Sequence, residues 1–331
     1  MNNKLDVIVT IRCITYNHEP YIRECLEGFV MQQTNFKFEA VVHDDASTDG
    51  TAAIIAEFAE KYPDIIKPLY ETENQYSKKD GSLQRIMTAH MRGKYIAMCE
   101  GDDYWTDPHK LQKQVDFLEA NPEYGLCFTN VDRYREDDKS CISSFFKESI
   151  RTEIKSLNNY ILRGVWLATC TWVLRTELYS QYQAWMGTRQ YSLGDLAIVS
   201  YILSRSKVEY LSDVTSVYRI HDGGVSNSKS ARVQYEFALS CLQLNQYICS
   251  TLLASHSDIL STIENRAIQD QLKNILFYEK KEAGIKYLKL VEFFNIKGFK
   301  VSSRIIIKYY NLFVFIVTLE KKYANMFVNE K

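Results

Sequence analysis

The sequence predicts an α/β fold built on a doubly wound, mainly parallel sheet with helices on both faces. Short apolar, β-branched runs alternate with segments whose apolar residues recur three and four apart, and this order repeats over about the first 130 residues. Polar residues follow directly on three of the apolar runs. Because ligands bind at the carboxyl ends of the strands in such sheets, these polar residues are candidates for one shared site.

The first three strands are predicted at residues 5–15, 38–42 and 65–70, which are rich in β-branched and apolar side chains. Residues 22–30 and 54–62 carry apolar side chains at helical spacing and predict the two intervening helices. The loop HDDASTDG offers Ser47, Thr48 or Asp49 as a cap for the second of these helices.

Residues 82–92 predict a third helix, and residues 95–99 predict the fourth strand. A fourth helix follows, with Leu111, Val115 and Leu118 on its buried face. A regular order of strands and helices implies parallel neighbours joined by right-handed crossovers.

Three carboxylates, Glu100, Asp102 and Asp103, stand within four positions at the end of the fourth strand, in the sequence CEGDDYWTDP. Like charges this close raise one another's pKa unless a cation or hydrogen-bond donors compensate. A divalent metal bound to a diphosphate is a natural compensator, because hard cations take carboxylate and phosphate oxygens together. A purely structural alternative, in which Asp107 caps the next helix and Pro108 occupies its first turn, leaves the three upstream acids unexplained.

Composition narrows the class of protein. The 331 residues are 46% hydrophobic and 24% charged, as in globular proteins, and the formal net charge of -1 gives no global attraction to nucleic acid. The first residues predict no secretory signal. The eight cysteines form no CxxC pair, so we expect reduced thiols in a cytoplasmic protein, with neither a disulfide framework nor a zinc site.

The motifs TYNHEPYIRECLEGFVMQ, VVHDDASTDGT and IAMCEGDDYWTDPHKLQKQVDFL follow one another as in the amino-terminal half of the family 2 glycosyltransferases, which this chain resembles. The resemblance covers about the first 130 residues and continues more weakly to about residue 226. It implies the GT-A fold and an inverting transfer of a sugar from a nucleotide-diphospho-sugar, with UDP-linked donors favoured. The implied acceptor is a hydroxyl of a saccharide or lipid-linked molecule in bacterial surface polysaccharide synthesis, and the implied cofactor is Mn2+ or Mg2+.

The resemblance also implies roles for individual residues. Contact with the nucleotide-sugar is implied for Thr15, Tyr16, Asn17, Glu19, Asp44, Asp45, Asp102 and Arg219. Asp103 is implied as a metal ligand, and His221 of the segment VYRIHDGG is a candidate for a further one. Which of Asp44 and Asp45 holds the base stays open. Glu100 stands where the family more often has aspartate, so its role stays open too.

Asp195, in YSLGDLAIVSYIL, matches the position of the family's catalytic base, and the resemblance implies that role. The same residue is a candidate helix cap, and the two roles are compatible. Residues 166–175 resemble the acceptor-side strand and loop, although a buried strand explains them equally well. The glycine-containing segment from His221 to Lys229 and Arg232 is a candidate mobile lid over the diphosphate.

We therefore expect a GT-A catalytic domain over residues 1–232, with a nucleotide-sugar-binding half at 1–130 and an acceptor and catalytic half at 131–232. A helical C-terminal region is expected over 233–331. Its apolar stretch, 305–319, is short for a membrane-spanning helix. Three uses stay open for it: packing against the catalytic domain, a homodimer contact, and peripheral contact with the inner face of the cell membrane.

Two other functions remain open at this point. A nucleotidyltransferase also combines a doubly wound sheet with paired acids on a metal, although TYNHEP lacks the glycine-rich phosphate loop that such enzymes usually need. A non-catalytic nucleotide-sugar-binding protein would keep the pocket and would not need a base at Asp195.

Overall fold

The computed structural model describes residues 7–222, 231–253, 259–260 and 262. The chain divides into two compact units, residues 1–224 and 225–331. The first unit holds the sheet, and the second holds helix α9 (Ala231–Leu252), where the sequence predicts a helix. Residues 223–230 of the candidate lid and the apolar stretch 305–319 lie outside the described residues, and Arg232 of the candidate lid belongs to α9. The domain boundary at residue 232 stays a prediction.

The predicted parallel core of the fold is present. Its strands are β1 (Val9–Thr15), β2 (Phe38–Asp44), β3 (Ile66–Tyr70) and β4 (Tyr95–Met98). They lie in the order β3-β2-β1-β4, and each neighbouring pair is parallel. The crossovers contain α1 (Ile22–Val30), α2 (Thr51–Lys61) and α3 (Ser82–Ala89), with the 3-10 turn η1 (Tyr76–Lys78) before α3.

Beyond β4 the sheet becomes mixed. The strands are β5 (Tyr104–Trp105), β6 (Tyr124–Arg135), β7 (Cys141–Ile142), β8 (Trp172–Arg175) and β9 (Lys207–Ile220). The order continues β4-β8-β6-β9-β5, with β8 antiparallel to both β4 and β6, and β7 attached to β6. β6 and β9 are parallel, and β5 folds back from the acidic turn to pair antiparallel with β9. The antiparallel insertions are the departure from a doubly wound sheet.

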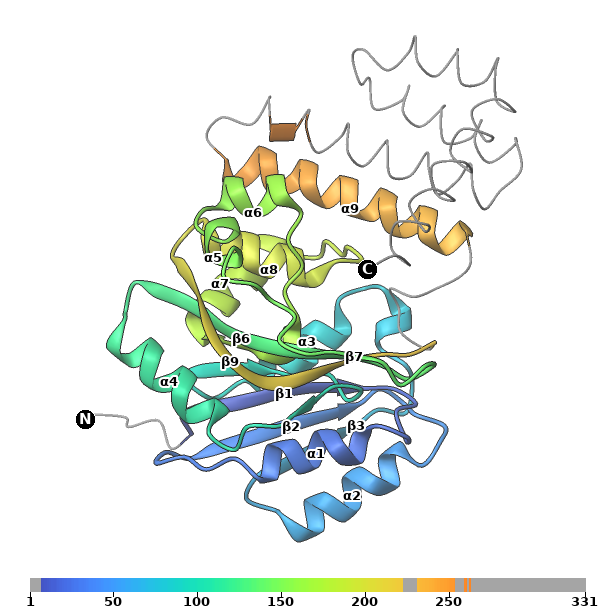
Figure 1. Cartoon of the computed structure of the whole chain (residues 1–331). Coiled ribbons are helices and arrows are strands. Elements are labelled where there is room, and N and C mark those ends of the chain that lie inside the picture. Colours follow the sequence, from blue (N-terminus) through green and yellow to red (C-terminus); the bar gives the residue numbers. More distant parts are fainter. Residues whose placement is uncertain (1–6, 223–230, 254–258, 261, 263–331) are drawn as a thin grey trace, which may run out of the picture. The chain divides into compact units, whose positions relative to one another are not determined.

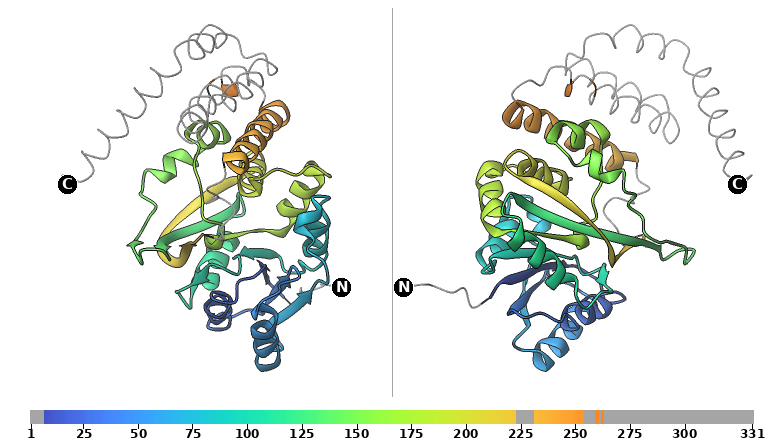
Figure 2. Two further views of the ribbon diagram at one scale, coloured as in Figure 1. Left: turned by 90° about the vertical axis from the view of Figure 1, so that its right-hand side faces the viewer. Right: turned by 60° about the vertical axis from the view of Figure 1, so that its left-hand side comes forward.

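Helices cover both faces of the sheet in the first unit. The remaining helices are α4 (Lys110–Ala120), α5 (Ile150–Glu153), α6 (Leu157–Arg163), α7 (Thr176–Met186) and α8 (Gly194–Leu203), and the 3-10 turn η2 (Thr169–Thr171) precedes β8. Figure 1 shows α1 and α2 on one side of the sheet and α7 and α8 on the other. Figure 2 shows the long β6 and β9 strands running together between these layers.

The caps of α2 and α4 are Gly50 and His109, so none of the predicted residues is the cap itself, although Asp49 and Asp107 bond to the backbone nearby. Helix α2 begins at Thr51, whose backbone N–H donates to Asp49 Oδ1 over 3.0 Å. Helix α4 begins at Lys110, so Pro108 precedes the helix and does not occupy its first turn. Asp107 Oδ1 accepts from the backbone N–H of His109 over 2.8 Å. The helix cap is His109, so the capping alternative for Asp107 is wrong, and the bond that Asp107 accepts involves none of the upstream acids.

Within the described part of the chain, no helix combines the length and the apolar character that crossing a membrane requires.

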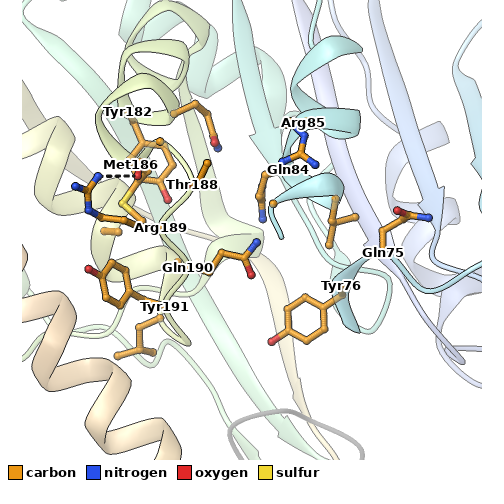
Figure 3. A pocket seen from close by; sticks show the side chains of 17 residues that line it. Gln75, Tyr76, Gln84, Arg85, Tyr182, Met186, Thr188, Arg189, Gln190 and Tyr191 are labelled. Carbon is orange, nitrogen blue, oxygen red and sulfur yellow. Dashed lines mark hydrogen bonds between the residues drawn. The ribbon is translucent and has the colours of Figure 1, made fainter. Parts of the chain in front are cut away.

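A cavity of about 190 Å³ lies in the first unit between the segment from η1 to α3 and the segment from α7 to α8 (Figure 3). Gln75, Tyr76 and Gln84 lie on one wall, and Arg189 and Gln190 lie on the other.

Lys110 is an unusual core residue, because a lysine is seldom fully buried. Its Nζ donates to Gln114 Oε1 over 2.6 Å and lies 4.4 Å from the centre of the Trp105 ring. Burial lowers the pKa of Lys110 to about 8. The charged side chain is thus tolerated next to the strand that carries the acidic turn, at a cost in stability.

The substitution Lys110→Met tests this cost. The folded-state pKa lies below the unfolded value, so the penalty is complete below pH 8 and disappears as the pH rises toward the unfolded pKa. Relative to the variant, the wild-type free energy of unfolding should increase by up to about 3 kcal/mol between pH 8 and pH 10.5. Urea unfolding at a series of pH values measures this difference. A difference that does not change with pH would show that Lys110 is neutral or solvated.

Candidate active site

The candidate site lies where the strand order reverses, because β1 has β2 on one side and β4 on the other. Ligands bind in the crevice at such a switch point. The loop after β1 and the acidic turn after β4 meet there, and Gly101 N–H donates to Ile14 O over 2.9 Å. The convergence at one sheet edge is as the sequence predicts.

Glu100 is fixed by two neighbours. Thr169 of η2 donates its hydroxyl to Glu100 Oε2 over 2.6 Å, and the guanidinium of Arg12 lies 3.9 Å from Oε1. Burial raises the pKa of Glu100 even though both neighbours favour its charged form. Glu100 therefore links the turn to η2 and to β1.

Asp103 is buried and is linked to β9. Its Oδ1 accepts from the backbone N–H of Arg219 over 2.8 Å, and only 3% of the residue is exposed. Burial, followed by the charge of Asp102, raises the pKa of Asp103 well above its usual range. This placement does not favour Asp103 as a metal ligand.

The Arg219 side chain is also occupied within the protein. Its Nε donates to the backbone carbonyl of Asp102 over 2.9 Å, and its two terminal nitrogens donate to Glu136 and Glu24. The guanidinium also lies 4.9 Å from the ring centres of Tyr21 and Tyr104. These contacts make Arg219 a clamp on the acidic turn, and they do not favour it as a phosphate ligand.

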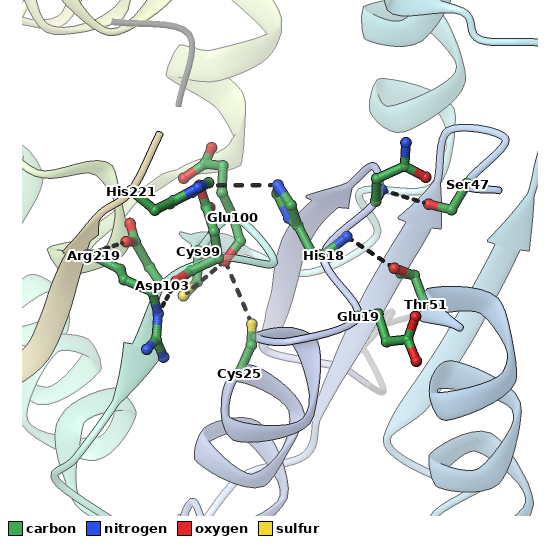
Figure 4. Close-up of polar contacts among 12 residues, drawn as sticks. His18, Glu19, Cys25, Ser47, Thr51, Cys99, Glu100, Asp103, Arg219 and His221 are labelled. Atoms are coloured by element: carbon green, nitrogen blue, oxygen red, sulfur yellow. Dashed lines mark hydrogen bonds and ion pairs between the residues drawn. The ribbon is translucent and has the colours of Figure 1, made fainter. Parts of the chain in front are cut away.

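Asp102 is the carboxylate that meets histidines. Its Oδ2 lies 3.1 Å from His221 Nε2 and 4.0 Å from His18 Nε2. Figure 4 shows His221 and His18 approaching the same place, one after β9 and the other from the loop after β1. One ligand atom from each of the three residues lies within 4.8 Å of the others, which is a set of donors that can hold a metal ion.

The ionisation states suit such a site. Burial opposes the charge on Asp102, but the hydrogen bond with His221 and the nearby imidazoles lower its pKa overall. Burial lowers the pKa of His18, although the Asp102 charge acts in the opposite direction. A carboxylate beside a neutral imidazole is the protonation state that metal binding requires.

The loop after β1 divides into residues that face the acidic turn and residues that support a neighbouring loop. Thr15 is buried, and its hydroxyl has no hydrogen-bond partner among the described residues. Tyr16 is 44% exposed. Asn17 adopts a left-handed conformation (φ 54°), and its Oδ1 accepts from the Thr48 N–H over 2.8 Å. Glu19 Oε2 accepts from the Gly50 N–H at the start of α2. Asn17 and Glu19 therefore support the loop before α2.

Asp44 and Asp45 have different surroundings. Asp45 accepts from the backbone N–H groups of Gln75 and Tyr76 through its two oxygens, over 2.7 and 3.0 Å. Asp44 ends β2 and accepts from the Ser47 hydroxyl. Burial raises the pKa of Asp44. Asp45 thus fixes the segment after β3, and Asp44 has fewer contacts within the protein.

Asp195 is the second residue of α8, and its Oδ1 accepts from the Leu196 N–H over 2.8 Å. The helix cap is Leu193, so the capping alternative for Asp195 is wrong. Burial raises the pKa of Asp195. Burial also raises the pKa of Tyr160, with a smaller contribution from the Asp195 charge, so the carboxylate lies toward α6.

The structure adds His18 to the predicted cluster. The sequence reasoning named Asn17 and Glu19 on either side of it and passed over the histidine itself. A histidine in a polar loop at the carboxyl end of β1, opposite an acidic turn, was the signal that could have identified it.

The mixed α/β sheet with polar loops at its switch point is the fold of the GT-A glycosyltransferases. The chain belongs to glycosyl transferase family 2, whose family model matches residues 10–181. The chain is similar to the crystal structure of S. aureus TarS 1-349, with a TM-score of 0.57 and 17% identity over 84% of this chain and 83% of that one. The predicted GT-A fold is thus confirmed.

Two curated relatives extend the comparison. An uncharacterized protein of Mycobacterium tuberculosis is 46% identical over 129 residues, which are 39% of this chain and 36% of the relative. This chain therefore spans little more than a third of that relative's length. The Escherichia coli protein WfaP, a UDP-Glc:alpha-D-GlcNAc-diphosphoundecaprenol beta-1,3-glucosyltransferase, is 27% identical over 67% of this chain and 81% of its own.

The substitution Gly101→Ala tests how closely the acidic turn approaches β1. A Cβ at Gly101 would lie 2.6 Å from Thr15 Oγ1, so the turn and the loop would have to separate. We expect a loss of about 1–3 kcal/mol in the free energy of unfolding. Gly194→Ala is the matched control, since no atom lies within 4 Å of its added Cβ. Equal effects of the two changes in urea unfolding would contradict the close approach.

Proposed function

We propose that this protein is an inverting glycosyltransferase that moves a sugar from a nucleoside-diphospho-sugar, UDP-linked by preference, to a hydroxyl of a saccharide or lipid-linked acceptor. The observation that carries the proposal is the Asp102–His221–His18 cluster at the switch point of a family 2 sheet. The UDP-sugar and lipid-linked acceptor in the name of WfaP support the same substrate classes, and bacterial surface polysaccharide synthesis is the setting that such an acceptor implies.

The residues fit a divalent cation, Mn2+ or Mg2+, because one carboxylate and two imidazoles place their ligand atoms together. Asp102 and His221 would hold it, with His18 as the third ligand. When bound, the cation supplies positive charge beside the diphosphate leaving group. Arg12 and Arg219 keep the other two acids of the turn in place, so that Asp102 remains free to face the cation.

The nucleotide would lie along the carboxyl ends of β1 and β2. Asp44 is better placed than Asp45 to accept from a nucleobase N–H, because both oxygens of Asp45 already accept from the backbone. Tyr16 is exposed beside it and offers an aromatic face to the base. Thr15 offers a hydroxyl beside the acidic turn. Asn17 and Glu19 support this surface from behind.

Asp195 would act as the general base. Its carboxylate would accept the proton of the acceptor hydroxyl as that oxygen attacks the anomeric carbon and the nucleoside diphosphate leaves. A single displacement of this kind inverts the anomeric configuration. The raised pKa of Asp195 makes it a stronger base than an exposed aspartate, and the helix start holds its second oxygen through Leu196.

Asp102→Asn tests the metal site. Thermal unfolding is followed with UDP, GDP, dTDP, CDP and ADP, each with and without Mn2+, because a ligand that binds only the folded protein raises its melting temperature. We expect a Mn2+-dependent increase with one diphosphate in the wild type, lost in Asp102→Asn and retained in Asp116→Asn, which changes an exposed acid of α4. No increase with any diphosphate would contradict the donor site.

Asp195→Asn tests the base. Donor binding should be retained, since Asp195 lies on α8 and apart from the switch-point loops, and turnover should fall by about 10²–10⁴. Wild-type kcat/KM should fall on the acid side at a pH above the ordinary aspartate value of about 3.9, because Asp195 is inactive once protonated. Transfer assays from pH 4 to pH 8 measure both effects. Wild-type turnover in the variant would remove Asp195 from the mechanism.

A further inference from the structure

The cavity between the η1–α3 segment and the α7–α8 segment joins the two halves of the proposed reaction. Gln75 and Tyr76, on one wall, donate their backbone N–H groups to Asp45 at the end of β2. Gly194, on the other wall, directly precedes Asp195. The volume of about 190 Å³ is below the roughly 300–1,000 Å³ of drug-sized sites, and it suits one sugar ring or part of one.

Gln84 presents a fixed amide to this cavity. Its Oε1 accepts from Arg12 over 3.0 Å and from the Tyr179 hydroxyl over 3.4 Å. Because the oxygen is held by these donors, the NH2 group is the end of the amide that remains for the cavity.

Gln190, on the opposite wall, also has its amide oxygen held by the protein. Its hydrogen-bonding needs are met when the amide oxygen accepts from the backbone N–H groups of Asp80 and Gly81. Its NH2 group is then the end left for a ligand. Figure 3 shows Gln190 reaching across toward the wall that carries Gln84 and Tyr76.

The charged side chains of the lining are directed to the backbone. Arg85 donates to the Asp80 carbonyl over 2.7 Å and lies 3.9 Å from the Asp80 carboxylate. Arg189 donates to the Met186 carbonyl over 3.4 Å. None of the described residues that line the cavity is an aspartate or glutamate. The cavity therefore favours an uncharged ligand that is rich in hydrogen-bond acceptors.

Apolar side chains complete the lining. Leu83, Tyr182, Met186 and Ala197 line the cavity and are each at most 6% exposed. A ligand group that combines an acceptor oxygen with a methyl group would satisfy the two amides and this apolar surface together. An acetamido group has this combination, whereas a hydroxyl group at the same position has no methyl.

We propose that this cavity recognises the acetamido group of a 2-acetamido-2-deoxyhexose, with Gln84 and Gln190 donating to its carbonyl oxygen and the apolar residues packing on its methyl group. The inference rests on the proposed glycosyltransferase function and names the sugar class of the same site. The acetamido sugar belongs either to the donor or to the acceptor, and the recognition chemistry is the same in both cases.

Saturation-transfer NMR on the full chain tests the acceptor source, with methyl 2-acetamido-2-deoxy-β-D-glucopyranoside and methyl β-D-glucopyranoside as probes. Calorimetry with UDP-GlcNAc and UDP-Glc in the presence of Mn2+ tests the donor source. We expect the acetamido form to bind at least about tenfold more tightly than the hydroxyl form in one of the two pairs. If that pair is the methyl glycosides, the acetyl methyl should be the most strongly saturated group.

Gln84→Glu and Gln190→Glu separate recognition from folding. Each keeps the oxygen that accepts from its protein partners and replaces the NH2 donor with a second oxygen, so the discrimination should fall to about twofold or less while the melting temperature is retained. Gln181→Glu, on the exposed side of α7, adds the same charge outside the cavity and should leave the discrimination unchanged.

Equal binding of acetamido and hydroxyl forms in both pairs would overturn the inference, as would discrimination that survives both cavity variants. UDP with Mn2+ serves as the internal reference. If UDP raises the melting temperature and no acetamido preference is found, only the sugar assignment fails. If UDP has no effect, the proposed glycosyltransferase function fails with it.

Discussion

The placement of three carboxylates on one turn, with Asp103 buried and Glu100 and Asp102 half-buried, is the constraint on which the site depends. Glu100, Asp102 and Asp103 would repel one another, and burial would neutralise them, unless each had its own compensation. Arg12 and Thr169 hold Glu100, the backbone of Arg219 holds Asp103, and two histidines face Asp102. The compensating groups come from β1, η2, β9 and the loop after β1, so the turn can adopt this form only when the whole first unit is folded.

The same constraint accounts for the mixed part of the sheet. A doubly wound parallel sheet would leave the acidic turn open toward solvent on the side away from β1. Here the chain turns back through β5, and Tyr104 and Trp105 pair antiparallel with Val217 and Ser216. This pairing brings the end of β9 to the turn, where the backbone and side chain of Arg219 bind two successive aspartates. β9 therefore supplies Arg219, which fixes the turn, and the residue directly after the strand is His221.

The sequence could predict features that depend on residues close together in the chain, and it could not predict contacts between residues far apart in it. The strands and helices of residues 9–120 depend on local periodicity, and the meeting of the loops after β1 and β4 follows from parallel topology alone. The choice between Asp102 and Asp103 depends on residues 116 to 119 positions away, which no local pattern reveals. Which side chains of β9 face the acidic turn, and in which direction each carboxylate points, depend on tertiary packing. Arg219 illustrates the difficulty, because a basic residue near a phosphate site reads as a ligand until Glu24 and Glu136 are seen beside it.

The proposed reaction needs different electrostatic surroundings for the leaving diphosphate and for the sugar, and different elements of the fold provide them. At the switch point, the lowered pKa values of Asp102 and His18 suit a cation and, through it, the growing charge of a leaving diphosphate. In the cavity next to α8, amide donors and apolar side chains surround a space whose arginines are directed to backbone carbonyls. A site built from fixed donors rejects a ligand that lacks the matching acceptor, because the donors would then be desolvated and unpaired. In the proposed reaction, the charged switch point would therefore stabilise the leaving group, and the uncharged hydrogen-bond donors of the cavity would select the sugar.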